Sequence, residues 1–448
     1  MERIRRVRGR VATFLPPAIR SRLPQGALTR GVLVLMLGTL AAQGLLVLTS
    51  PILTRVYEPA DLGVLSVYTA ILSVLLTITC LSYELAIPLP EDELAAANVL
   101  ALSLLVDLAM SVVAGLVLVV VGSNLLGAFG AERLAPFAIL IAVGQFAGGL
   151  LIALTAWAIR ARRFQVIAGT QVVQSGSLAG TQISLGLVGL GPVGLVIADV
   201  VSRAVAAATV GQSAWRTHSG FLRRATFRGV AEVASRYRRF PVLSTPSALL
   251  NTLGLQAPSL LVVSLYGAGV GGQLFLAQRI AAIPVTLLAR SVGQVYQSEA
   301  ARLVREDPTR MRPLFLRTTR SLMRSGAIPA LLLAVAAPVL FGPVFGEEWR
   351  EAGWYTAFLT PVYYLTLTTS PTGATLDVLE RQDLHLVRET MRLVLVGGAV
   401  VLAAAIHLPA LGAIAVLSVA GCLTYLMYGL ISWWAIVDAE RRQARTGS

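Results

Sequence analysis

The chain has 448 residues, of which 56% are hydrophobic and 13% are charged, and its mean hydropathy is +0.74. A soluble globular domain is about 25% charged, so this composition excludes an ordinary soluble enzyme. All 37 basic residues are arginine and the net charge is +14. The lack of lysine excludes a Walker A loop and Schiff-base catalysis, and the apolar content favours a membrane over nucleic acid as the partner of these arginines.

Twelve apolar stretches are each about as long as a helix that crosses a bilayer, which needs about 20 residues. The first six stretches are 31–53, 62–82, 95–121, 134–159, 166–187 and 192–210. The second six are 242–266, 272–296, 325–345, 354–376, 393–406 and 411–436. The first is too long for a signal peptide, so we expect it to be retained. The chain is therefore predicted to be an all-α integral membrane protein with about 12 transmembrane helices.

The arginines predict the orientation of these helices. In the twelve-helix arrangement 31 of the 37 arginines fall on one side. Basic loops face the cytoplasm, so both termini are predicted to be cytoplasmic. The predicted parts are a basic tail, a six-helix lobe, a basic linker, a second six-helix lobe and a short tail, at 1–30, 31–213, 214–240, 241–437 and 438–448.

A weak internal repeat supports two equivalent lobes. An offset of 209 residues aligns the turn after the first helix of each lobe and gives the identities Tyr57/Tyr266, Gly63/Gly272, Leu65/Leu274 and Ile71/Ile280. Six helices per lobe give both lobes the same orientation, so the lobes should be related by a pseudo-two-fold axis along the membrane normal. Two such lobes would enclose a central cavity at their interface.

Ionisable residues within membrane helices are functional candidates, because burying them in lipid is costly. Arg279 and Arg290 are eleven residues apart in one predicted helix and should share a face at depths about 16 Å apart. Gln294 continues that face. Such a ladder suits an anionic solute with hydrogen-bonding groups. The alternative is that each arginine extends toward its nearer membrane surface.

Two aspartates are candidates for coupling to an ion. Asp199 and Arg203 are spaced i,i+4, which favours a pair on one helix face. That pair is either structural or responsive to protons or ions. Asp107 lies near mid-depth without a partner close in sequence, so it would bind an ion or pair with an arginine of another helix. Neither the two cysteines nor the three histidines have ligand spacing, so we expect no metal and no cofactor.

Polar stripes follow two of the predicted helices. Gln174 lies on a stripe of the fifth helix, and Asn251 lies on a stripe of the seventh. Such residues line a wet cavity suited to sugar hydroxyls or hold helices together. Prolines interrupt the seventh and tenth helices, at positions 241, 246 and 258 and at positions 361 and 371. They permit hinges for alternating access, or static kinks.

Several motifs resemble those of bacterial polysaccharide flippases of the Wzx type. In the first lobe they are GTLAAQ at 38–43, SPILTRVY at 50–57, DLG at 61–63 and YELAIP at 83–88. In the second they are FPVLSTPS at 240–247, LLNT at 249–252, LAQRI at 276–280 and QVYQSE at 294–299. The resemblance covers most of residues 30–300 and does not extend to the drug exporters of the related MATE group.

The resemblance implies the fold of the multidrug/oligosaccharidyl-lipid/polysaccharide flippase superfamily. It also implies translocation of undecaprenyl-diphosphate-linked oligosaccharide units across a bacterial inner membrane, with a polysaccharide polymerase and export proteins as partners. Arg55 matches the family signature and would hold or gate the head group at the outer mouth. The site hypothesis assigns the diphosphate to Arg279, Arg290 and Arg203. The alternative function is an ion-coupled small-molecule or drug antiporter of the same fold.

Overall fold

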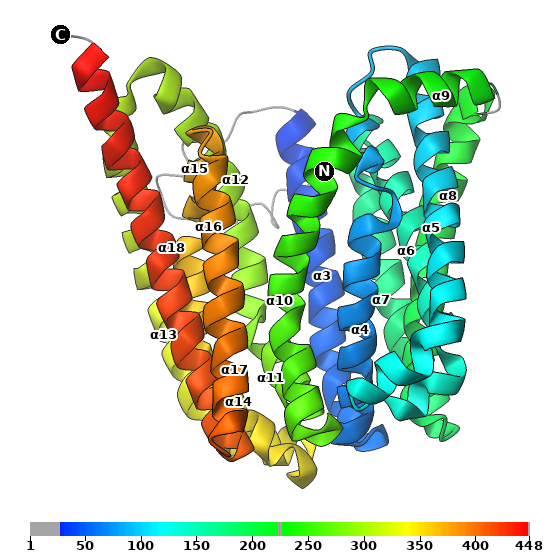
Figure 1. Ribbon diagram of the computed structural model, residues 1–448, viewed down its shortest axis with the longest axis vertical. Coiled ribbons are helices and arrows are strands. Elements are labelled where there is room, and N and C mark those ends of the chain that lie inside the picture. The colour runs from blue at the N-terminus through cyan, green and yellow to red at the C-terminus, as the bar shows by residue number, and fades with distance from the viewer. Residues whose placement is uncertain (1–26, 223, 225, 447–448) are drawn as a thin grey trace, which may run out of the picture.

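The computed structural model describes residues 27–222, 224 and 226–446, and these residues are almost entirely helical (Figure 1). The basic tail predicted at 1–30 lies almost wholly outside the described residues. Each of the first six predicted stretches contains one α-helix, and the fourth also includes the end of a preceding 3-10 turn. These helices are α3 (Ala27–Val56), α4 (Pro59–Thr79), α5 (Glu93–Ala128), α6 (Ile139–Arg160), α7 (Phe164–Leu187) and α8 (Gly191–Leu222).

Local chemistry explains where several of these helices begin. Pro59 stands in the first turn of α4, where its missing N–H costs nothing. The Asp92 carboxylate accepts a hydrogen bond of 2.8 Å from the backbone N–H of Ala95 and so caps α5. Two short 3-10 turns connect these helices, η2 (Tyr83–Ala86) and η3 (Glu132–Phe137).

The second half is also helical but more broken. It starts with α9 (Phe227–Arg236), the π-turn η4 (Phe240–Ser244), α10 (Thr245–Tyr266), α11 (Ala268–Ala281), α12 (Ile283–Glu306) and the turn η5 (Pro308–Arg310). It continues with α13 (Met311–Phe345), η6 (Glu347–Trp349), α14 (Arg350–Thr369), η7 (Pro371–Ala374) and α15 (Thr375–Val378). It ends with α16 (Gln382–Arg392), the π-turn η8 (Leu393–Gly397), α17 (Gly398–Ala405) and α18 (Ala410–Thr446).

Eight of the described helices are long and apolar enough to cross a membrane on their own. The other predicted spans are helical but fall short of that criterion, for reasons visible in the sequence. The fifth, α7, carries the polar stripe. The eighth is divided between α11 and α12, and the eleventh consists of the π-turn η8 followed by the short helix α17. The tenth ends at Thr369, before Pro371. Helices of this kind depend on neighbouring helices, because lipid does not satisfy polar groups.

Two details differ from the sequence prediction. The predicted single helix at 272–296 ends at Ala281, and α12 begins at Ile283. Pro284 accounts for the break, since proline has no N–H to donate and its ring clashes with the preceding turn. The arginine-rich stretch after this helix, expected to be a loop, is mostly helical because α13 begins at Met311. Arginine is a good helix former, so charge alone does not predict a loop.

The helices form two groups that meet along α4, which packs against α10 and α11 (Figure 1). We call the end with the α3–α4 and α10–α11 turns the closed end. The opposite end, with α9, the start of α3 and the end of α18, is the wide end, where the two groups spread apart (Figure 1). One apolar core cluster includes residues of both groups, among them Leu62, Tyr68, Leu276 and Phe341. The closed end is therefore a packed contact.

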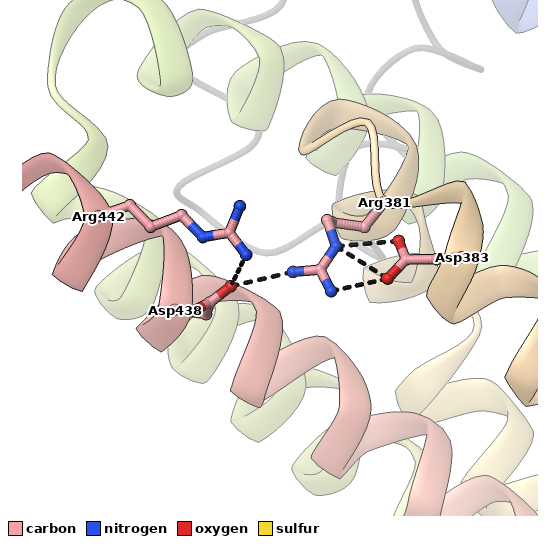
Figure 2. Close-up of polar contacts among 4 residues, drawn as sticks. All are labelled: Arg381, Asp383, Asp438 and Arg442. Carbon is pink, nitrogen blue, oxygen red and sulfur yellow. Dashed lines mark hydrogen bonds and ion pairs between the residues drawn. The ribbon is translucent and has the colours of Figure 1, made fainter.

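An ion-pair network joins α16 to α18 near the wide end (Figure 2). The Arg381 guanidinium contacts the Asp383 carboxylate at 2.8 Å and the Asp438 carboxylate at 3.0 Å. Arg442 also contacts Asp438, at 2.9 Å. Hydrogen bonds from Arg381, together with its charge, hold the pKa of Asp383 at about 2, well below its usual range. The network fixes the end of α18 to the start of α16, so this part of the second half is held together.

Candidate functional site

Two glycines of the closed end let the two groups of helices pack backbone against backbone. A Cβ on Gly63 of α4 would lie 1.9 Å from the carbonyl oxygen of Ala268, and one on Gly272 of α11 would lie 1.7 Å from that of Pro59. The offset of 209 residues relates Gly63 to Gly272 and Pro59 to Ala268. The two contacts are therefore equivalent by pseudo-symmetry, and they place the pseudo-two-fold axis between α4 and α11.

Further hydrogen bonds hold the closed end together. The indole Nε1 of Trp349 donates to the carbonyl oxygen of Thr54 at 3.0 Å, across the two groups. The Gln273 amide of α11 donates to the carbonyl of Glu348 and accepts from the N–H of Ala352 at 2.8 Å. Trp349 is fully buried. This end is therefore closed by specific, desolvated contacts.

Toward the wide end the interface between α4 and α10 becomes polar and weaker. The hydroxyls of Thr77 and Thr252 lie 3.0 Å apart, and those of Ser82 and Thr245 lie 2.9 Å apart. A neutral hydrogen bond contributes only about 1 kcal/mol net. These pairs can align α4 and α10 without locking them together.

Arg279 of α11 crosses between the two groups. Its Nη2 donates to the carbonyl oxygen of Leu46 in α3 at 3.0 Å. The helix break at Ala282 places Arg279 and Arg290 on different helices, so the prediction of one continuous helical ladder is wrong in that respect. The side chain of Arg290 lies outside the described residues. Gln294 is exposed on α12.

The predicted pair on α8 is present and has a third member. The Arg203 Nε donates to the Asp199 carboxylate at 2.7 Å, and its Nη2 donates to the other oxygen at 3.2 Å. The Tyr68 hydroxyl of α4 donates to the same carboxylate at 3.0 Å. This bidentate geometry neutralises both charges. Arg203 is thus engaged within its own lobe and differs from Arg279, which reaches across.

Asp107 of α5 is fully buried among hydroxyls and an amide. One carboxylate oxygen accepts from Thr79 at 2.6 Å and from Ser111 at 3.4 Å, and the Gln145 amide donates to the Thr79 hydroxyl at 3.4 Å. Among the described residues the other carboxylate oxygen has no hydrogen-bond partner. Gly149 makes room for the group, since a Cβ there would lie 2.0 Å from the carboxylate. Hydroxyls, not an arginine, are therefore its partners.

Asn251 is engaged by an arginine that the sequence places in a loop. The Arg392 Nη2 donates to the backbone and side-chain oxygens of Asn251 at 2.8 and 3.0 Å. Arg392 is 8% exposed and also pairs with Glu389. Its burial follows from α16 packing against α10, which no local pattern in the sequence indicates. Arg392 is thus a buried polar link that sequence reasoning missed.

The remaining two candidates lie at the periphery of this interface. Arg55 is exposed at the closed end and donates to the carbonyl of Pro51 in its own helix at 2.9 Å. Gln174 is half-buried on α7. On the same helix Gln171 accepts a hydrogen bond of 2.8 Å from Thr39 of α3, so part of the α7 stripe holds helices together.

Comparison with protein families gives the affiliation of the chain. A model of polysaccharide biosynthesis proteins matches residues 52–353, well over half of the sequence. The chain belongs to this family. No curated protein sequence matches it.

Solved structures share the fold across nearly the whole chain. An inward-facing multidrug resistance MATE transporter of the MOP superfamily has a TM-score of 0.73 and 16% identity, and the match covers 89% of this chain and 96% of that one. The lipid II flippase MurJ, in an inward closed conformation, has a TM-score of 0.69 and 11% identity, covering 91% and 90%. The predicted all-α membrane fold with two lobes is thereby confirmed, and the protein is a multi-pass membrane protein.

Proposed function

We propose that this protein is a flippase that moves undecaprenyl-diphosphate-linked oligosaccharide units across the bacterial inner membrane by alternating access. Membership in the polysaccharide biosynthesis family carries this proposal. The fold shared with a lipid II flippase supports it, because a two-lobed membrane fold can expose a central cavity to one side at a time. The partners would be a polysaccharide polymerase and export proteins.

The wide end would face the cytoplasm and the closed end the periplasm, with both termini cytoplasmic. The distribution of arginines supports this orientation. In the alternate state the glycine contacts between α4 and α11 would separate while the wide end closes. The protein would act as a carrier and not as an enzyme.

Arg279 is the residue that would engage the diphosphate most directly, because its guanidinium is partly buried and bonded to a neutral backbone carbonyl. A diphosphate could displace that carbonyl and gain a charge-assisted contact. Arg290, Arg55 and Gln294 would assist it, whereas Arg203 already neutralises Asp199. Asp107 would serve ion coupling, since one of its buried carboxylate oxygens has no hydrogen-bond partner among the described residues.

The test is export of the glycan in cells that depend on this protein. Arg279→Ala should abolish export at normal protein abundance, while Arg279→Lys, which keeps the charge, should retain part of it. If Arg279→Ala and Arg290→Ala both export normally, the arginines do not bind the cargo.

The buried Asp107 carboxylate also favours the second candidate, an ion-coupled small-molecule antiporter of the same fold. An antiporter would leave glycan export intact when the protein is deleted, and it would move protons or sodium against a small cation. Ion flux in proteoliposomes without lipid-linked glycan distinguishes the two functions.

A further inference from the structure

Four arginines of α13 line a groove near the wide end. The groove has a volume of about 1140 Å³, and its described lining residues are Arg312, Pro313, Leu316, Arg317, Arg320, Ser321, Arg324 and Ser325. Small-molecule sites are usually about 300–1000 Å³, so the space is ample for a large polar head group. None of these eight residues is acidic. The groove therefore carries a concentrated positive charge.

Three of these arginines are available to a ligand. Arg312 stacks on the Trp433 ring, with its guanidinium carbon 4.6 Å from the ring centroid. Arg317, Arg320 and Arg324 are exposed, and no carboxylate of the described residues forms an ion pair with them. Topology accounts for arginines on this side of the membrane, but it does not require them to share one groove.

An exposed apolar stripe continues from the same face of α13. Ile328, Leu331, Val335 and Val339 follow Arg324 at i+4, i+7, i+11 and i+15, and each is 66–70% exposed. At 100° per residue they stay within roughly 60° of Arg324 around the helix, and at 1.5 Å per residue they extend about 22 Å from it. One helix face thus offers arginines at one end and hydrocarbon contact along the rest.

We propose that this face of α13 is a docking surface for the polyprenyl-diphosphate cargo. At this first contact, before the cargo reaches Arg279, the groove arginines bind the diphosphate bidentately and the stripe lies along the polyprenyl chain. The assignment rests on the proposed function, and charge and size favour this occupant over a phospholipid. The positive charge of three free arginines exceeds the negative charge of a single phosphate, and a diphosphate, which carries more negative charge, matches it better. The groove volume also accommodates the sugars attached to the diphosphate.

The test compares two triple variants of the full-length protein in lipid nanodiscs. The groove variant is Arg317→Gln, Arg320→Gln and Arg324→Gln. The control is Arg228→Gln, Arg238→Gln and Arg239→Gln, which removes the same charge from exposed arginines of the linker region. The probes are undecaprenyl diphosphate and phosphatidylglycerol, and binding is measured by native mass spectrometry.

We expect the groove variant to bind undecaprenyl diphosphate at least tenfold more weakly than the wild type. The control variant should bind it within twofold of the wild type, and the groove variant should bind phosphatidylglycerol as the wild type does. Equal losses in the two variants, or an equal loss of phosphatidylglycerol, would overturn the docking surface. Wild-type binding that does not distinguish undecaprenyl diphosphate from phosphatidylglycerol would overturn the proposed function as well. Wild-type selectivity that the groove variant keeps would overturn only the docking surface.

Discussion

Substituting Gly272 with alanine should open the closed end. The new Cβ would lie 1.7 Å from the carbonyl oxygen of Pro59, whereas real Cβ contacts are at least 3.0 Å, so α11 and α4 must separate by about 1.3 Å. Forcing atoms into a packed contact costs about 1–3 kcal/mol. A cost of about 2 kcal/mol, borne only when this end is closed, shifts the balance between the two states about 30-fold toward opening.

Hydrogen exchange measured by mass spectrometry in nanodiscs detects this shift. Peptides covering 59–66 and 266–274 should exchange faster in Gly272→Ala than in the wild type. Gly269→Ala is the matched control, because a Cβ at that position of α11 meets nothing within 4 Å. If the two variants exchange alike, the glycine contact does not hold the closed end and the reasoning fails.

Three further predictions concern buried and interfacial charges. Asp199→Asn should destabilise the protein by about 3 kcal/mol, because it leaves the Arg203 guanidinium without its carboxylate partner. Replacing both Asp199 and Arg203 with leucine should cost less. If the single and the double variant unfold at the same temperature, this prediction is refuted. Asp107→Asn should abolish transport without lowering the unfolding temperature, and retained transport would remove Asp107 from ion coupling. Arg381→Gln should lower the unfolding temperature by the same amount at pH 7 and pH 5. The reason is that Asp383, with its pKa near 2, stays charged at both pH values. If the difference in unfolding temperature between wild type and variant is smaller at pH 5 than at pH 7, the pairing of Arg381 with Asp383 is contradicted.

The sequence predicts the helices well because a membrane span needs only length and apolar composition. It also predicts the pair of Asp199 with Arg203, since both lie within one turn of a single helix. The contact of Arg392 with Asn251 was beyond reach, because α16 and α10 are far apart in the chain.

The internal repeat identified two residues of the interface between the lobes but not their contact. The offset of 209 residues aligned Gly63 with Gly272 as a weak identity. It did not reveal that these glycines meet across the two lobes, which depends on how α4 crosses α11. The break at Ala282 was likewise missed, because Pro284 lies in an otherwise apolar run and proline within a helix such as α13 does not always break it.

The most direct test of the account is flipping of an undecaprenyl-diphosphate-linked oligosaccharide in proteoliposomes that contain the purified protein. Glycan in the outer leaflet is measured by its accessibility to an added enzyme that modifies the exposed sugar. The account predicts protein-dependent movement of the glycan lipid between leaflets, which Arg279→Ala abolishes. Movement no faster than in protein-free liposomes, with the folded protein present, would contradict the proposed function.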